Sequence, residues 1–511
     1  MANTTPILVA SGQYVFRDVL TADNALAPVD IAAEAAKVAL ASAQANTPLA
    51  AHIDTIAYIR GFIDSIPGGA CPLGASNNVP RSLAKRIGAD PQNAIYGREG
   101  GHSPQRFVNE FAEKIAAGEM TMGLIAGAEA TGIMKQALKA GLALDWSEQV
   151  DGQLDDRGCH LLFTDYEINH GITFPTQVYP LFENAWRARH GLSEAAHRTL
   201  ASKLFAKFSE VAASNPYSQF PTVRSEAFLN EVSKENYWVA RPYTKWMVAQ
   251  DAVNQGAALL MCSVDKAIEL GIPESQWVYL HSYADVDDRW VSERPDLAVS
   301  ETMRLSLNAV LGSVGKSIDQ IDIMDIYSCF PIAVLAACEA MGLDWTTDKP
   351  LTVTGGLPFF GGAGNSYSTH AIASLTDALR SKPQDYGLIT ANGGFLSKQS
   401  VGVYSAQAPA KPCHNADPNL QAKFNALPRA ELVEQAEGVG SIETYTLVYN
   451  RGVATLGMVV GRFDDGRRFL ANTDAEDESS LATMAGEAEL IGRKVRVHHK
   501  ANKNIVSFNL D

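Results

Sequence analysis

The stretch IDTIAYIRGF at residues 53–62 returns in altered form as IDQIDIMDIYSCF at residues 318–330. Each stretch follows a helical pattern and leads to a pair of adjacent glycines, Gly100–Gly101 in the first case and Gly361–Gly362 in the second. A further helical pattern and an apolar strand, MGLIAGAEA or YGLITANGG, complete each unit. The two stretches begin 265 residues apart and the two glycine turns lie 261 residues apart. This near-constant offset indicates an internal duplication.

The alternation of strands and helices predicts an α/β protein, because parallel strands need long crossover connections that helices usually provide. In such sheets, ligands bind near the carboxyl ends of the strands, which is where both glycine turns fall. Each turn precedes a helix, so its backbone N–H groups are placed to hold an anion or an oxyanion. The alternative is that the glycines only allow close packing of strand and helix.

An insertion and a C-terminal extension interrupt the duplication. The insertion is long, which is typical of a lid or binding subdomain. Short strands and the turn Asp464-Asp465-Gly466 predict a small β-barrel at the C-terminus, resembling an oligonucleotide/oligosaccharide-binding (OB) fold. The predicted parts are a first half (1–131 and 246–270), a loop insertion (132–245), a second half (271–405), a linker (406–430) and the β domain (431–511).

Composition narrows the class of protein. The net charge of −15 argues against binding to nucleic acid or to an anionic membrane surface. The chain has 46% apolar and 19% charged residues, no basic and apolar leader pattern, and no apolar run long enough to insert in a membrane, so we expect a cytoplasmic globular protein. The six cysteines are dispersed, and no His, Asp or Glu cluster has the spacing of a metal site.

Residues 5–405, approximately, resemble the thiolase superfamily in the duplication, in the insertion and in the sequence around the glycine turns. The strongest resemblance is to thiolase-like proteins related to the sterol-carrier-protein-type thiolases, which carry the label acetyl-CoA acetyltransferase because of their ancestry. It rests on the segments GGHSPQ and GGLPFFGGAGNSYSTHA and on the β-rich extension. The resemblance implies a duplicated thiolase fold with five layers, αβαβα, an inserted loop domain and the OB-like β-barrel. It also implies a coenzyme A thioester as substrate or ligand.

The same resemblance implies that the usual catalytic residues are missing. The family's nucleophilic cysteine falls on Gly101, its activating histidine on Gly362, and its second catalytic cysteine on Ala391. Conventional thiolase chemistry needs a thiolate and proton-transfer groups, which glycine and alanine cannot supply. The family's Asn-Glu-Ala-Phe block, or His-Asp-Cys-Phe in the sterol-carrier type, reads Tyr327-Ser328-Cys329-Phe330 here.

Four residues are therefore candidates for replacement chemistry. His102 follows the first glycine turn, where a helix N-terminus would keep it neutral as a base. Tyr327 would donate a hydrogen bond to a thioester oxygen. Cys329 is a candidate nucleophile with packing as its alternative, and His370 is a candidate whose alternative is a buried, hydrogen-bonded helix residue. The predicted substrate-binding residues are Asn254, Gln255, Gly361, Asn365, Tyr367, Asn392 and Gly393.

Several functions stay open at this point. The nominal one is an acetyl-CoA C-acyltransferase that requires no cofactor, and another is a retro-aldolase-type C–C lyase acting on an acyl-CoA, which needs a base but no acyl-enzyme. A third is a non-catalytic protein that binds or scaffolds acyl-CoA or acetyl-CoA. The resemblance also implies a homodimer formed through the core sheet, unless the C-terminal domain covers that surface.

Overall fold

A single sheet runs through both halves of the chain. The structure is a computed structural model and describes residues 3–160, 162–347 and 349–510. The strand order is β10-β11-β12-β9-β1-β8-β4-β2-β3-β5, with β13 paired to β9. The strands of the sheet are β1 (Pro6–Val15), β2 (Thr55–Tyr58), β3 (Asn93–Tyr96), β4 (Met122–Ala130), β5 (Asp155–Asp156), β8 (Asn254–Ser263), β9 (Val278–Asp287), β10 (Ile323–Ile326), β11 (Tyr386–Gly393), β12 (Lys398–Ser405) and β13 (His414–Asn415).

The pairing pattern confirms the duplication. The order β1-β8-β4-β2 of the first half recurs as β9-β12-β11-β10 in the second. In both halves the first two pairings are antiparallel and the third is parallel. The halves join where β1 pairs with β9, through Ile7 opposite Tyr279.

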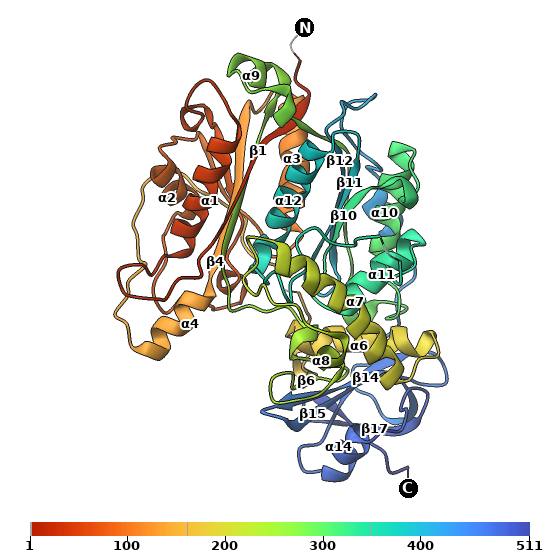
Figure 1. Ribbon diagram of the computed structural model, residues 1–511. Helices are drawn as coiled ribbons and strands as arrows, with labels where there is room; N and C mark the ends of the chain where they lie inside the picture. The colour runs from red at the N-terminus through yellow and green to blue at the C-terminus, as the bar shows by residue number, and fades with distance from the viewer. Residues whose placement is uncertain (1–2, 161, 348, 511) are drawn as a thin grey trace.

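Helices complete the five layers predicted from the resemblance (Figure 1). The helices α3 and α12 pack against strands of both halves and form the middle layer, whereas α1 and α2 cover the first half and α10 and α11 the second. Helix α12 is buried on nearly all sides, as a central helix must be. These helices are α1 (Pro28–Ser42), α2 (Val79–Ile87), α3 (Ser103–Ala116), α10 (Glu301–Val314), α11 (Pro331–Met341) and α12 (Tyr367–Ser381).

The insertion is mainly helical and packs beneath the second half. Helix α6 contacts both α11 and β14, and it buries Phe182 and Trp186 against the core. The elements of the insertion are α4 (Thr131–Ala140), β5, α5 (Asp165–Asn169), α6 (Pro175–Arg189), α7 (Glu194–Ser214), α8 (Glu226–Asn230), β6 (Trp238–Ala240) and β7 (Tyr243–Thr244). Helix α9 (Val264–Glu269) lies outside it and follows β8.

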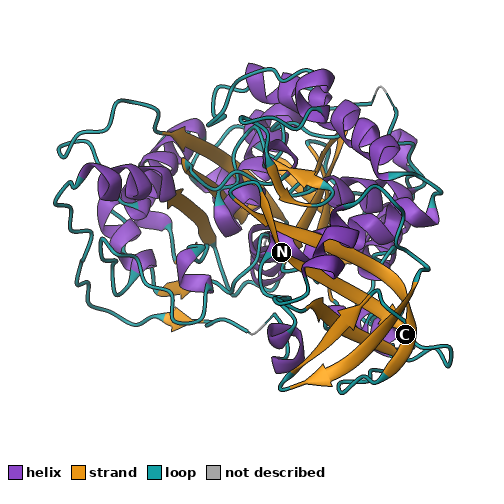
Figure 2. Ribbon diagram, turned by 90° about the horizontal axis from the view of Figure 1, so that it is seen from below, coloured by secondary structure: helices purple, strands orange, loops and turns teal. Residues whose placement is uncertain are grey.

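The C-terminal extension forms a second sheet with its own core. Strands β14, β15, β16, β18 and β17 form a closed ring, because β14 pairs with both β15 and β17 (Figure 2). Phe469 and Val497 are among the side chains buried inside it. The elements are β14 (Gly438–Asn450), β15 (Val453–Arg462), β16 (Arg468–Thr473), α14 (Glu478–Ala485), β17 (Lys494–Lys500) and β18 (Lys503–Ser507).

The segment predicted as a linker, 406–430, contains structure of its own. Strand β13 pairs with β9, and the short helix α13 (Leu420–Asn425) packs beside it. Leu420 and Phe424 are buried there. The segment therefore lies against the second half. Among the described residues, no helix is long and apolar enough to cross a membrane.

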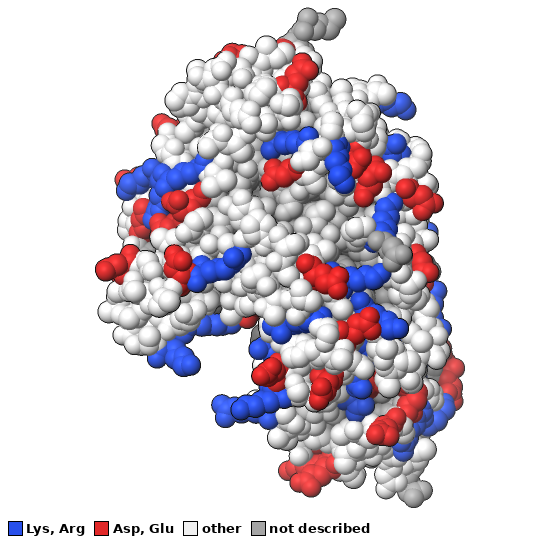
Figure 3. Space-filling view, in the orientation of Figure 1, with Lys and Arg blue, Asp and Glu red and all other residues white. Residues whose placement is uncertain are grey.

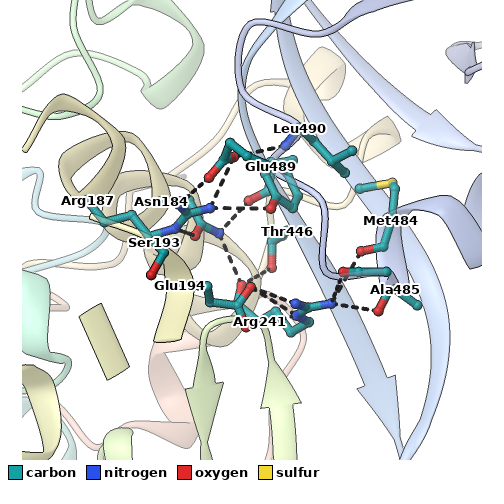
Figure 4. Close-up of polar contacts among 12 residues, drawn as sticks. Asn184, Arg187, Ser193, Glu194, Arg241, Thr446, Met484, Ala485, Glu489 and Leu490 are labelled. Carbon is teal, nitrogen blue, oxygen red and sulfur yellow. Dashed lines mark hydrogen bonds and ion pairs between the residues drawn. The ribbon is translucent and has the colours of Figure 1, made fainter. Parts of the chain in front are cut away.

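Two arginines of the insertion bind the C-terminal sheet (Figure 4). Arg187 of α6 is fully buried and donates to Asn184 Oδ1 at 2.7 Å and to Glu489 Oε2 at 2.5 Å. Arg241 pairs with Glu194 and donates to the carbonyl oxygen of Ala485 at 2.9 Å. Strand β6 also pairs with β14, so the insertion extends the C-terminal sheet.

Candidate functional site

The two glycine turns meet where the halves face each other. The amide nitrogen of Gly100 donates to Asn365 Oδ1 at 2.9 Å, and Ser368 Oγ donates to the carbonyl oxygen of Gly101 at 2.7 Å. Asn365 Nδ2 donates in turn to the carbonyl oxygen of Arg60 at 2.9 Å. The structure thus brings Gly100 and Asn365 together, and the Asn365 side chain links the two halves.

There is no room for a side chain at residue 101. A Cβ atom built on Gly101 would lie 2.2 Å from Tyr327 Oη and 2.7 Å from the carbonyl oxygen of Asn392. Both separations are far below van der Waals contact. The phenol of Tyr327 occupies the space that a side chain at residue 101 would need.

His102 lies on the other side of the same turn. It is 1% exposed, and a Cβ built on either Gly100 or Gly393 would lie within 2.6 Å of its Nδ1. Among the described residues, this nitrogen has no hydrogen-bond partner. Burial, together with the positive charges of Arg106, Lys398 and Arg98, lowers the pKa of His102 well below its ordinary value. The imidazole is therefore neutral, with one nitrogen unpaired.

Tyr327 and Cys329 follow β10 and are both buried. Burial, reinforced by Cys329, raises the pKa of Tyr327 well above its ordinary value, so the phenol stays protonated and is a hydrogen-bond donor. Burial raises the pKa of Cys329 to about 12. A thiol with that pKa is not a thiolate at neutral pH, which makes it a poor nucleophile.

A residue of the insertion, Tyr179, reaches the end of β11. Asn392 Nδ2 donates to Tyr179 Oη at 2.9 Å, while Gln399 Nε2 donates to Asn392 Oδ1 at 3.0 Å. Tyr179 Oη donates to the carbonyl oxygen of Gly394 at 3.1 Å, and its ring stacks on Phe330 at 4.2 Å. Asn392 is thus held within a hydrogen-bonded network beside Ala391.

The second glycine turn is also filled. A Cβ on Gly361 would lie 2.3 Å from Gln255 Oε1, and one on Gly362 would lie 3.0 Å from the carbonyl oxygen of Gln250. Gln255 Nε2 donates to the carbonyl oxygen of Phe360 at 3.0 Å. Asn254 points elsewhere, because its Oδ1 accepts from the amide of Ile133 at 2.7 Å. Gln255 lies at the turn, whereas Asn254 caps α4.

His370 and Tyr367 lie inside α12 and the second half. His370 Nδ1 is 2.8 Å from Gln13 Oε1, and its ring lies edge-on to Phe360. The hydroxyl of Tyr367 donates to Asp325 Oδ1 at 3.0 Å. Both side chains are completely buried, with polar partners that tie α12 to its neighbours.

Comparison with known proteins identifies the family. A solved structure of a monomeric SCP2-thiolase like protein type 1 from Mycobacterium smegmatis matches at 40% identity and a TM-score of 0.84, covering 99% of each chain. The chain belongs to this family of type 1 thiolase-like proteins. The family model for the additional C-terminal domain of thiolase-like protein type 1 matches residues 419–502. None of the curated proteins matches.

Two thiolases share the fold of this type 1 thiolase-like protein. Human mitochondrial 3-ketoacyl-CoA thiolase, solved in complex with CoA, is 17% identical, with a TM-score of 0.55 over 80% of this chain and all of its own. The dimeric peroxisomal thiolase of Saccharomyces cerevisiae is 15% identical, with a TM-score of 0.57 over 80% of this chain and 98% of its own. At this identity the likeness concerns the fold alone.

The sequence did not point to two residues that shape the site in this family member. Tyr179 lies in the aromatic-rich run PTQVYPLFENAW, and nothing in that run separates it from a core residue. Gln250 limits the space at Gly362 with its backbone carbonyl oxygen, and no sequence pattern reveals such a contact. Within the described residues, no group of three or more His, Cys, Asp or Glu side chains is placed to hold a metal ion.

The buried His370 predicts a pH dependence of stability in this type 1 thiolase-like protein. Burial lowers the pKa of His370 to about 3, so below pH 6.5 the unfolded chain binds a proton that the folded chain does not. The free energy of unfolding is fully retained above pH 6.5 and falls as the pH drops, by about 2 kcal/mol at pH 5. We expect His370→Gln to reduce the decrease in urea midpoint between pH 7 and pH 5. His160→Gln, at an exposed histidine, is the control, and an unchanged decrease in His370→Gln would contradict the assignment.

Proposed function

We propose that this protein binds coenzyme A or an acyl-CoA thioester and does not catalyse conventional thiolase condensation or thiolysis. The observation that carries the second part is the separation of 2.2 Å between Tyr327 Oη and a Cβ atom at residue 101. An acyl-enzyme needs a nucleophile at this position and space for the acyl group. The phenol takes that space, and neither Gly362 nor Ala391 supplies a proton-transfer group.

The first part of the proposal is supported by two cations of the insertion and by aromatic rings packed against them. The guanidinium of Arg224 lies 3.4 Å from the centre of the Trp246 ring, and Lys245 Nζ lies 5.1 Å from the same centre. Among the described residues, Arg224 Nε has no hydrogen-bond partner. Trp246 stacks in turn on Phe359, two residues before the second glycine turn. Phosphates held at Arg224 would thus leave the thioester arm directed toward the glycine turns.

The surface near this group is suited to a polyanion. On the face drawn in Figure 3, Lys and Arg side chains gather around the notch between the α4 region and the C-terminal domain. Helix α8, which begins two residues after Arg224, borders this notch (Figure 1). Such local positive charge is compatible with the net charge of −15, because only the field at the site matters for binding. The human thiolase of the same fold was solved with CoA bound.

Arg224→Ala is expected to weaken CoA binding by at least about tenfold, because a charge-assisted contact to phosphate is lost. Isothermal titration of the full chain with CoA measures the effect. Arg198→Ala is the matched control, since Arg198 also lies over a tryptophan of the insertion, at 5.7 Å from the Trp238 ring centre, and should change affinity less than about twofold. Absence of binding at millimolar CoA, or equal effects of the two variants, would contradict the proposal. Thiolysis of acetoacetyl-CoA should stay at the level of the protein-free reaction.

A second candidate is a retro-aldolase-type C–C lyase, favoured by the neutral, unpaired Nδ1 of His102. In that reaction a base removes the hydroxyl proton of a 3-hydroxyacyl-CoA, the Cα–Cβ bond breaks, and an aldehyde and a thioester enolate form. The enolate is then protonated, and the phenol of Tyr327 would stabilise its oxygen. Aldehyde release that disappears in both His102→Ala and Tyr327→Phe supports this candidate. Aldehyde release that neither substitution affects would exclude these roles.

We propose further that the protein is a monomer and that its C-terminal domain has the OB fold. The outer edge of β3 is already paired with β5, and Arg60 forms an ion pair with Asp156 there, which favours a monomer. The M. smegmatis relative is monomeric. The closed ring β14-β15-β16-β18-β17 has the strand connections that an OB barrel requires. The cytoplasmic location stays a prediction.

A further inference from the structure

A cavity that the site above does not use lies on the α1 side of the first half. It has a volume of about 80 Å³, opens partly to solvent, and lies at the carboxyl ends of the parallel strands β2, β3 and β4, where α/β sheets usually place their ligands. Its apolar wall includes Val29, Met134 and Trp146. Its polar groups are the side chains of Tyr58, Asp64, Tyr96 and Glu129, together with Cys71, Ser76 and Thr131.

Two deeply buried polar groups line this cavity, and one of them lacks a partner. Tyr58 is 2% exposed, and among the described residues its hydroxyl has no hydrogen-bond partner. Glu129 is 5% exposed, and its Oε1 accepts from the amide of Phe62 at 2.7 Å. Buried hydroxyl groups are normally satisfied, so the unpartnered Tyr58 hydroxyl beside the buried Glu129 carboxyl points to something that binds next to them.

Two acidic side chains, Asp64 and Glu129, line the cavity, and the Arg60 guanidinium lies over the Tyr96 ring at 4.2 Å from its centre. Burial, with Asp64 and Asp251 adding to it, raises the pKa of Glu129 to about 8. Asp64 accepts a hydrogen bond from Tyr96 Oη. The described residues that line the cavity include no Lys, Arg or His. A cation is therefore the missing partner, because it would balance the charge of Asp64 and would offset the cost of ionising the buried Glu129 carboxyl.

The two helices that begin at the cavity do not make it an anion site. The amide at the start of α1, on Ala27, already donates to Asp30 Oδ2 at 3.0 Å. In the first turn of α4, Gly132 donates to the carbonyl oxygen of Val253 and Ile133 to Asn254 Oδ1. The N–H groups that would hold an anion are thus occupied, and the Asp64 carboxylate repels one.

We propose that this cavity binds a small primary ammonium compound with a flat apolar body. Asp64, Glu129 and the hydroxyl oxygen of Tyr58 would accept the three N–H bonds of the ammonium group. The body would lie against Trp146 and Met134, which supply an aromatic face and apolar surface. The proposal is independent of CoA binding, since it shares no residue with Arg224 or the glycine turns.

The test compares 2-phenylethylammonium chloride with its neutral analogue 2-phenylethanol by isothermal titration of the full chain at pH 7.5. For so small a ligand we expect a dissociation constant of about 1 mM, with the alcohol binding at least about tenfold more weakly. Equal affinity for the two compounds, or no saturable binding of the amine, would overturn the proposal.

Isosteric variants locate the binding. Glu129→Gln should weaken amine binding by about tenfold and Tyr58→Phe by about threefold. Asp251→Asn is the control, because Asp251 is a nearby carboxylate that pairs with Lys135 outside the cavity, and it should leave affinity within about twofold. Circular dichroism checks that each variant folds. A crystal soaked with 2-(4-bromophenyl)ethylamine should show bromine density between Trp146 and Met134. Bromine density found only at other places would refute the assignment.

Discussion

Gly101→Ala should be among the most destabilising single-atom additions in this protein. The new methyl group would lie 2.2 Å from Tyr327 Oη and 2.7 Å from the carbonyl oxygen of Asn392, so both the phenol and the backbone of β11 must shift. Overpacking of this kind costs about 3 kcal/mol and lowers the melting temperature by several degrees. Gly101→Cys, which places a thiol at the position of the thiolase nucleophile, should be at least as destabilised and should not gain thiolase activity.

Two further variants test the cause of this effect. Combining Gly101→Ala with Tyr327→Ala should cost less than the sum of the single changes by about 1–2 kcal/mol, because the phenol no longer opposes the methyl group. Gly312→Ala is the matched control, since Gly312 lies on the exposed side of α10 with no atom near the position its Cβ would take, and it should stabilise by up to about 1 kcal/mol. Additive single and double effects would show that Tyr327 is not what excludes a side chain at residue 101.

Arg187→Met should loosen the C-terminal sheet from the insertion. The side chain of Arg187 is 1% exposed, and its removal leaves Asn184 Oδ1 and the carbonyl oxygen of Leu192 without their donor and Glu489 without its cation. Because Glu489 is 46% exposed and stays solvated, the main loss is that of the hydrogen bonds to buried acceptors, which costs about 1–3 kcal/mol. We expect a lower melting temperature and faster amide exchange in β14 and β17, measured by hydrogen exchange.

Arg189→Met provides the control on the same helix. The Arg189 side chain is 47% exposed, and its contacts with Asp296 and Glu339 are long, at 3.6 and 3.7 Å. Such exposed pairs contribute less than about 1 kcal/mol, so hydrogen exchange in the C-terminal sheet should not change. Equal protection loss in the two variants would show that burial of Arg187 does not hold the sheet in place.

The fold could be predicted from the sequence because duplication leaves a periodic record. The stretches at 53–62 and 318–330 become the equivalent strands β2 and β10. The first glycine turn lies between β3 and α3 as predicted, whereas the second precedes α12 but follows a loop after α11 instead of a strand. The presence of a β-rich C-terminal domain was also readable, since its strands and hairpin turns are local features. The pairing of β6 with this domain could not be predicted, because pairing between segments some 200 residues apart leaves no local pattern.

The site was harder to predict because its character depends on contacts between distant residues. The sequence indicated that Gly101 lacks a thiol, but only the structure shows Tyr327 in the vacated space. His102 was expected to be neutral from its position at a helix N-terminus, whereas burial is the larger cause. Glu129 stands in an apolar strand and reads as an ordinary strand residue, so the cavity beside it was not foreseen.

The contact between the C-terminal ring and the insertion has a consequence for building chimeras. Met458, Val460 and Leu470, on the outward side of β15 and β16, pack into the main hydrophobic core, and Asn504 and Tyr166 hydrogen-bond across the same boundary. A chain truncated after the second half would therefore expose apolar surface on the insertion, and a transplanted C-terminal ring would carry an apolar patch of its own. A chimera of two related proteins should therefore take the insertion and the C-terminal ring from the same parent, because the two segments pack as one unit although they are far apart in the sequence.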